Sequence, residues 1–157
     1  MTEEYQVITE RKKKIFDWFK NPHNSIFLGI LILGIALRIY FFIVTKNQAL
    51  WWDETDYMAY AKNLAGFSTH WIVTGEHNSL LVYLIAFLFR IGIQEASIKF
   101  LIEVIPSILL VYLTYEIVKL IYRDKKIALI SAFLMAVCWN ILFNSMRFHV
   151  GVPSLFL

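Results

Sequence analysis

The feature that most constrains this chain is a run of 19 residues, Ile26–Val44, that contains a single charged side chain, Arg38. A helix needs about 20 apolar residues to cross the hydrocarbon core of a membrane. Two later apolar runs are Ile98–Ile121 with 24 residues and Ile127–Phe143 with 17. Hydrophobic residues make up 59% of the chain, whereas soluble domains contain about 45–50%. The sequence therefore predicts an all-α membrane protein with three transmembrane helices.

A fourth apolar run, Leu80–Ile93, has only 14 residues and contains Arg90. Apolar runs of this length are more often interfacial, re-entrant or buried than spanning. If the run does not cross, the basic clusters Arg11–Lys14 and Arg123–Lys126 fall on the same side of the membrane, as the positive-inside rule prefers for cytoplasmic segments. Because both clusters flank apolar runs, they fit a membrane boundary better than nucleic-acid binding.

These assignments divide the chain into a cytoplasmic basic tail, 1–25, and a membrane domain, 26–157, with an exterior loop at 45–97. Two interfacial helices are expected in that loop. The basic tail followed by an apolar run resembles a signal peptide, but the run is too long and lacks a small-residue cleavage site, so we expect a retained anchor. The single cysteine forms no disulfide within the chain, and the scarcity of cysteine favours a prokaryotic plasma membrane over the endoplasmic reticulum.

An acid pair, Asp53 and Glu54, follows Trp51 and Trp52 shortly after the first span. The spacing of the next apolar residues predicts an amphipathic helix along the membrane surface, with the tryptophans at headgroup level. The pair has two interpretations from the residues alone. The acids are either the N-cap and the acidic first turn of this helix, or groups that carry chemistry at the membrane surface.

The order of features resembles the N-terminal part of the GT-C membrane glycosyltransferases. An apolar span with a late arginine is followed by "DE" with a tyrosine three residues on, a surface helix, "EHN", "RIGIQEASIKF", a span, "YRDKK" and another span. The likeness covers roughly 26–157 and is nearest to the protein mannosyltransferase and aminoarabinose transferase branch. It implies a truncated GT-C type bundle that takes a sugar from a polyprenyl-phosphate carrier and passes it to a protein or lipid hydroxyl.

The resemblance implies that Asp53, in the first exterior loop, is the catalytic base, partly buried beside the tryptophans. Glu54 is the alternative base or an orienting partner. Transfer to a hydroxyl needs a base that takes the acceptor's proton as attack proceeds, and the departing polyprenyl phosphate needs a cation. Arg38 is one candidate for that cation; its alternative role is to extend its long side chain to the interface.

Further candidates for binding the carrier phosphate are Lys99, His77, Arg147 and His149. Lys99 and His77 match basic positions of the family, although Lys99 is also spaced to pair with Glu103 on one helix face. Arg147 and His149 lie at the expected membrane edge, where they either bind phosphate or end the third span. Several relatives carry a second functional aspartate there, before a proline, and this chain has no carboxylate at that place.

Metal dependence stays open at this level. His70, Glu76 and His77 carry side chains that bind divalent cations, but their spacing matches no strong metal motif and fits ordinary surface polarity better. No other cofactor is expected.

The main alternative function is a non-catalytic small membrane subunit or a transporter fragment. Arg38, Lys99 and Glu103 suit a transport path, but transporters place polar groups near the midplane between broken helices, whereas the polar residues here gather in the exterior loop. An interfacial lipid-binding module is a further alternative. The chain ends within a new apolar stretch, "GVPSLFL", so we expect it to be part of a longer enzyme, and its activity in isolation stays open.

Overall fold

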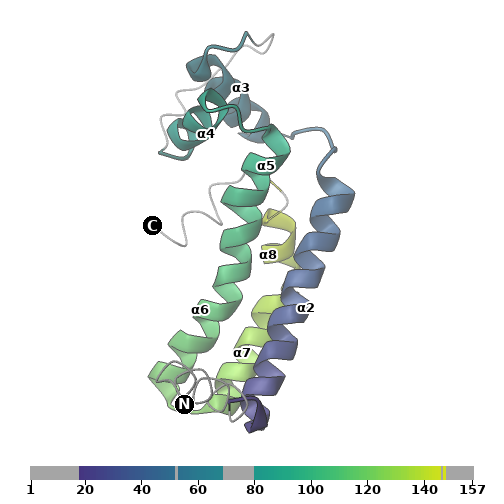
Figure 1. The fold of residues 1–157 in the computed structure, drawn as a ribbon, viewed down its shortest axis with the longest axis vertical. Helices are drawn as coiled ribbons and strands as arrows, with labels where there is room; N and C mark the ends of the chain where they lie inside the picture. Colours follow the sequence, from purple (N-terminus) through teal and green to yellow (C-terminus); the bar gives the residue numbers. More distant parts are fainter. Residues whose placement is uncertain (1–17, 52, 69–79, 146, 148–157) are drawn as a thin grey trace, which may run out of the picture.

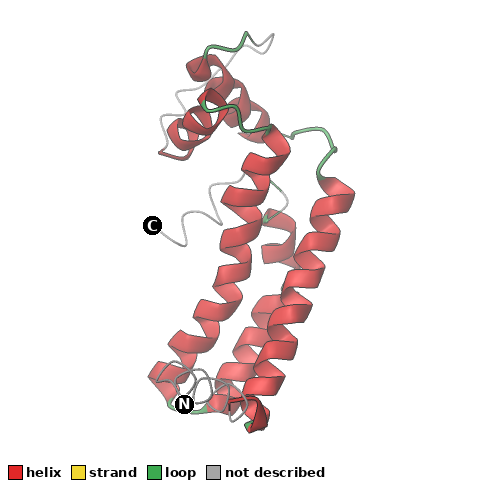
Figure 2. Cartoon of the chain, viewed as in Figure 1, coloured by secondary structure: helices red, strands yellow, loops and turns green. Residues whose placement is uncertain are grey.

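The computed structural model describes residues 18–51, 53–68, 80–145 and 147. These residues form helices, turns and loops, and no strand (Figure 2). The predicted all-helical class is therefore confirmed. The elements in chain order are α2 (Pro22–Thr45), α3 (Asp53–Ala65), α4 (Leu80–Arg90), α5 (Glu95–Lys99), the π-helix η1 (Phe100–Val104), α6 (Ile105–Tyr122), α7 (Lys125–Val137) and α8 (Trp139–Asn144).

The long helices α2, α6 and α7 run side by side, and α3 and α4 lie together beyond one end of this bundle (Figure 1). The turn between α6 and α7 lies at the other end, close to the start of α2. Helix α4 therefore lies beyond the end of the bundle rather than beside the long helices.

Among the residues that the structure describes, two helices are long and apolar enough to cross a membrane: α2, and the continuous helix Glu95–Tyr122 that comprises α5, η1 and α6. The prediction of a third span over Ile127–Phe143 is not confirmed, because this run does not form one continuous helix. Helix α7 has 13 residues, which extend about 20 Å at the helical rise. Cys138 then adopts an extended conformation with ψ of 112°, and α8 begins at the next residue.

Small side chains allow α2 and α7 to approach closely. Ala128, Ala132 and Ala136 are all completely buried on α7, and their spacing of four residues places them on one face. A Cβ atom added to Gly34 of α2 would lie 3.4 Å from the Cβ of Ala136. Helices in membranes commonly associate through such small residues because the backbones gain van der Waals contact.

Two glycines of α2 provide a matched test of this packing. We expect Gly34→Leu to lower the free energy of unfolding by about 1–3 kcal/mol, because the added carbons overpack the contact with α7. Gly29 is exposed, and a Cβ atom added there would have no neighbour within 4 Å, so Gly29→Leu should be neutral or stabilising by up to about 1 kcal/mol. Thermal unfolding of the detergent-solubilised protein measures both changes, and equal melting temperatures would contradict the packing.

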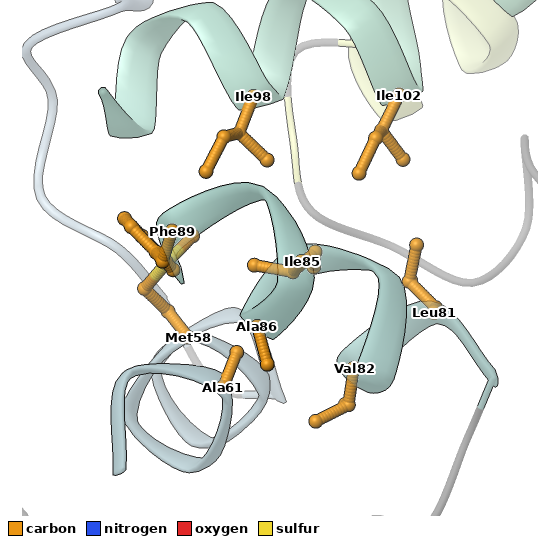
Figure 3. Packing of buried hydrophobic residues seen from close by; sticks show 9 residues of the cluster. All are labelled: Met58, Ala61, Leu81, Val82, Ile85, Ala86, Phe89, Ile98 and Ile102. Carbon is orange, nitrogen blue, oxygen red and sulfur yellow. The ribbon is translucent and has the colours of Figure 1, made fainter. Parts of the chain in front are cut away.

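A second apolar cluster fixes α3 and α4 to the start of the second long helix (Figure 3). The predicted apolar face of α3 is confirmed, since Ala61 is buried and Tyr57, Tyr60 and Leu64 pack against the cluster. The acid pair at the start of α3 is thereby positioned against the end of the bundle. The buried members of the cluster are Met58, Ala61, Leu81, Val82, Ile85, Ala86, Phe89, Ile98 and Ile102.

Candidate functional site

Glu54 is the buried member of the acid pair, with 4% of its surface exposed. Its Oε2 atom accepts a hydrogen bond from the backbone N–H of Trp51 at 3.1 Å, while its own N–H donates to the carbonyl of Trp51, also at 3.1 Å. These two bonds close the chain onto the first turn of α3, much as a capping box does. The second carboxylate oxygen, Oε1, is buried and has no hydrogen-bond partner among the described residues.

Arg147 completes this arrangement from beyond the end of α8. Its guanidinium lies 3.3 Å from Glu54 Oε2 and 4.6 Å from the ring centre of Trp51. The same group stands 5.5 Å from the ring of Phe143. Only 13% of the Arg147 side chain is exposed, so this ion pair is shielded from water. Two aromatic faces and one carboxylate therefore hold the cation in place.

Lys99 and Glu103 bring further charge to the same end of the bundle, and both are buried. The ammonium group of Lys99 interacts electrostatically with Glu54, Arg147, Glu103 and Glu95. The interaction between Lys99 and Glu103 agrees with the pairing that their spacing in the sequence indicates. Lys99, Arg147 and Glu54 thus form one charged cluster, which we call the exterior cluster.

A π-helical turn, which sequence reasoning missed, lies between Lys99 and the rest of the second long helix. The N–H of Ile105 donates to the carbonyl of Phe100, five residues back. Pro106 follows at the start of α6, and a proline ring clashes with the carbonyl four residues before it in an ordinary α-helix. The widened turn relieves that clash, so Pro106 is the sequence signal for it. Such π-turns frequently occur at functional sites.

Asp53 is the first residue of α3 and is exposed. The prediction that it is partly buried beside the tryptophans is therefore wrong, and the burial falls on Glu54. The residue spacing explains the difference, because Glu54, Met58 and Ala61 share the face of α3 that packs inward.

Burial, and then the charges of Asp53 and Asp56, raise the pKa of Tyr57, which keeps its phenol protonated at neutral pH.

Arg38 lies inside the bundle and is completely buried. It donates to the hydroxyl of Ser107 and, at 3.0, 3.1 and 3.4 Å, to the carbonyls of Gly34, Ala136 and Met135. The prediction that its side chain reaches toward the exterior face is wrong. The last carbonyls of α7 lack helical donors because the helix breaks at Cys138, and the guanidinium supplies the missing hydrogen bonds.

The position of Arg38 separates it from the exterior cluster. Ser107 follows Lys99 by eight residues, which corresponds to about 12 Å along the helix. Arg38 therefore holds α2, α6 and α7 together in this structure. Its N–H groups donate to backbone carbonyls and to the hydroxyl of Ser107. We do not place it among the candidates for binding a phosphate.

The predicted residues His77 and His149 lie outside the described residues, as do His70 and Glu76. Among the residues that the structure describes, no group of three or more histidine, cysteine, aspartate or glutamate side chains is arranged to hold a metal ion.

Two pockets adjoin the exterior cluster and share Gln48 as a lining residue. One pocket, of about 240 Å³, lies between α2 and α8 and is mainly apolar; Phe41, Trp139, Phe143 and Arg147 are among its lining residues. The other, of about 190 Å³, is lined mainly by polar residues. Neither was predictable from the sequence, because their walls come from segments far apart in the chain. The polar pocket is lined by Lys46, Asn47, Gln48, Leu50, Glu95, Ala96 and Lys99.

The exterior cluster and its surroundings thus combine an exposed acid, a buried acid with its arginine, a buried lysine, and one apolar and one polar pocket. Such an arrangement suits an amphiphilic ligand with an anionic group, because the cations and the apolar wall lie next to each other. No family model, curated protein or solved structure matches the chain.

Proposed function

We propose that this chain is the N-terminal portion of a GT-C type membrane glycosyltransferase. The enzyme transfers a sugar from a polyprenyl-phosphate carrier to a protein or lipid hydroxyl on the exterior face of the membrane. The observation that carries the proposal is the acid pair at one end of two membrane-length helices, with Asp53 exposed and Glu54 buried against Arg147. One acid is open to substrate while the other is fixed.

In the proposed reaction, the acceptor oxygen forms a bond to the anomeric carbon of the sugar as the bond from that carbon to the phosphate oxygen breaks. The acceptor's proton passes to the carboxylate of Asp53. The polyprenyl phosphate leaves with the bonding electron pair, and Arg147 and Lys99 stabilise its charge. Arg147 and Lys99 belong to the exterior cluster. Asp53 directly precedes Glu54, the third member of that cluster, in the chain.

The two pockets support a lipid-linked donor. The apolar pocket between α2 and α8 suits the first isoprene units, and Arg147 in its lining suits the phosphate. The polar pocket offers amide, ammonium and carboxylate groups for the hydroxyls of a sugar. Because Gln48 lines both, a ligand that passes from one pocket to the other would contact it.

Glu54 is proposed as a positioning residue. Its carboxylate holds both the backbone of Trp51 and the guanidinium of Arg147, so it fixes the start of α3, where Asp53 lies. Glu54→Gln keeps the side-chain shape but removes the charge that Arg147 faces. We expect sugar transfer to fall by roughly tenfold, since Asp53 stays in place but is held less firmly.

The experiment is release of polyprenyl phosphate by the full-length enzyme in liposomes that contain a polyprenyl-phosphate sugar and an acceptor. Glu116→Gln is the matched control, because Glu116 pairs with Lys119 at 2.6 Å near the opposite end of the second long helix and should affect transfer little. Wild-type enzyme that turns over no lipid-linked sugar would overturn the proposed function. Equal rates for wild type and Glu54→Gln would overturn the positioning role alone.

A transporter fragment is the second candidate, and one observation favours it. Arg38 was expected near the exterior face, whereas the structure buries it beside the break between α7 and α8. Transporters build substrate sites from such broken helices near the midplane. In liposomes, flux of an anionic solute without a new covalent product would favour this candidate over sugar transfer.

A further inference from the structure

A second charged region lies at the end of the bundle opposite α3 and α4, around the turn that joins α6 to α7 (Figure 1). A cleft of about 530 Å³ opens there. Two of its lining residues are apolar, three are basic and one is acidic. They are Glu116, Ile117, Lys119, Leu120, Arg123 and Lys125.

Glu116, the acid that lines this cleft, forms an ion pair with Lys119. Lys119 Nζ contacts both carboxylate oxygens of Glu116, at 2.8 and 2.6 Å, and lies 5.0 Å from the ring of Tyr115. Within the described part of the chain, Arg123 and Lys125 form no ion pair. Once Lys119 is paired with Glu116, the cleft therefore has a net charge of two positive side chains, Arg123 and Lys125.

The turn itself orients these two cations. Arg123 ends α6 in the left-handed conformation, with φ of 52°, and Lys125 is the first residue of α7. Asp124, the acid between them, is engaged as the N-cap of α7, where its Oδ1 accepts the backbone N–H of Lys126 at 2.7 Å. The positive end of the α7 dipole adds to the potential at the same place.

The apolar side of the cleft continues directly along the outside of α6. Ile117 and Leu120 are 53% and 79% exposed, which is unfavourable in water and favourable against acyl chains. A cation pair at the boundary of a membrane-length helix, next to an exposed apolar wall, matches an anionic lipid better than a free anion.

We propose that this cleft binds an anionic phospholipid, with the headgroup phosphate on Arg123 and Lys125 and an acyl chain along Ile117 and Leu120. This site is separate from the proposed transfer reaction, since it lies at the other end of the long helices. The bound lipid anchors the α6–α7 turn at the membrane boundary.

The test is native mass spectrometry of the full chain, titrated with phosphatidylglycerol or phosphatidylcholine of matched acyl chains. We expect wild type to retain phosphatidylglycerol preferentially. The double variant Arg123→Gln, Lys125→Gln should reduce that preference roughly tenfold or more, since each basic residue near an anionic membrane surface strengthens binding several-fold. Lys126→Gln is the matched control: Lys126 is exposed and adjacent but does not line the cleft, so the preference should persist.

Three outcomes would overturn the proposal. One is equal retention of the two lipids by wild type. Another is the same loss for Lys126→Gln as for the double variant, which would indicate general surface charge. The third is binding of glycerophosphoglycerol, the soluble headgroup, as tightly as the whole lipid, which would remove the role of the apolar wall. Unchanged helix content and elution volume of each variant establish that the fold is intact.

Discussion

Asp53→Asn should reduce the proposed sugar transfer by the full-length protein roughly 100- to 10,000-fold, the range over which a positioned base contributes to catalysis. Asparagine keeps the shape of the side chain and an oxygen that accepts hydrogen bonds, but it does not take up the acceptor's proton. Insertion and folding should be unaffected, because Asp53 is exposed at the start of α3. Release of polyprenyl phosphate in liposomes measures the loss.

The same substitution distinguishes catalysis from helix capping. Asparagine is about as good as aspartate at a helix N-terminus, so a purely structural Asp53 would tolerate the change and turnover would stay normal. Asp56→Asn is the matched control within the same helical turn, and its activity should remain close to that of wild type. Binding of the lipid carrier, measured separately, should survive Asp53→Asn because the cations of the exterior cluster are unchanged.

The largest effect on stability is expected for Arg38→Met. Methionine fills a similar volume, but the carbonyls of Met135 and Ala136 and the hydroxyl of Ser107 lose their donor. Each buried polar group left unsatisfied costs about 1–3 kcal/mol, so we expect a loss of several kcal/mol and a clear drop in melting temperature. The end of α7 should also loosen.

A chemical probe of that loosening is built into the chain. Cys138 is the only cysteine and lies at the helix break, so its rate of alkylation by a maleimide should rise in Arg38→Met. Arg90→Met is the control, because the exposed Arg90 donates to the carbonyl of Leu64 at the surface. If Arg38→Met melts at the wild-type temperature and Cys138 reacts at the wild-type rate, Arg38 does not hold the helices together.

Local patterns predicted most of the fold. Long apolar runs located α2 and the second long helix, and three-and-four spacing located the inward face of α3. The same spacing contained a signal that distinguishes the two acids, since Glu54 lies four and seven residues before the buried Met58 and Ala61. The prediction of a buried Asp53 rested on its neighbours in sequence, whereas the helical face decides which acid is buried.

The break in the third apolar run was not predictable from local sequence. No proline or glycine occurs between Lys125 and Asn144, and those residues are the usual causes of a sharp break. The carbonyls that the break leaves open are satisfied by a guanidinium about 100 residues earlier in the chain. Long-range contacts of this kind also determine the pockets.

The contact of Arg147 with Glu54 and Trp51 has a consequence for biosynthesis. The acid pair leaves the ribosome more than 90 residues before the arginine that holds it. During that interval the second long helix and α7 are synthesised while the carboxylate of Glu54 still lacks this cation. The exterior cluster is therefore among the last parts of the described chain to form, and a protein interrupted before Arg147 would carry its long helices without a finished site.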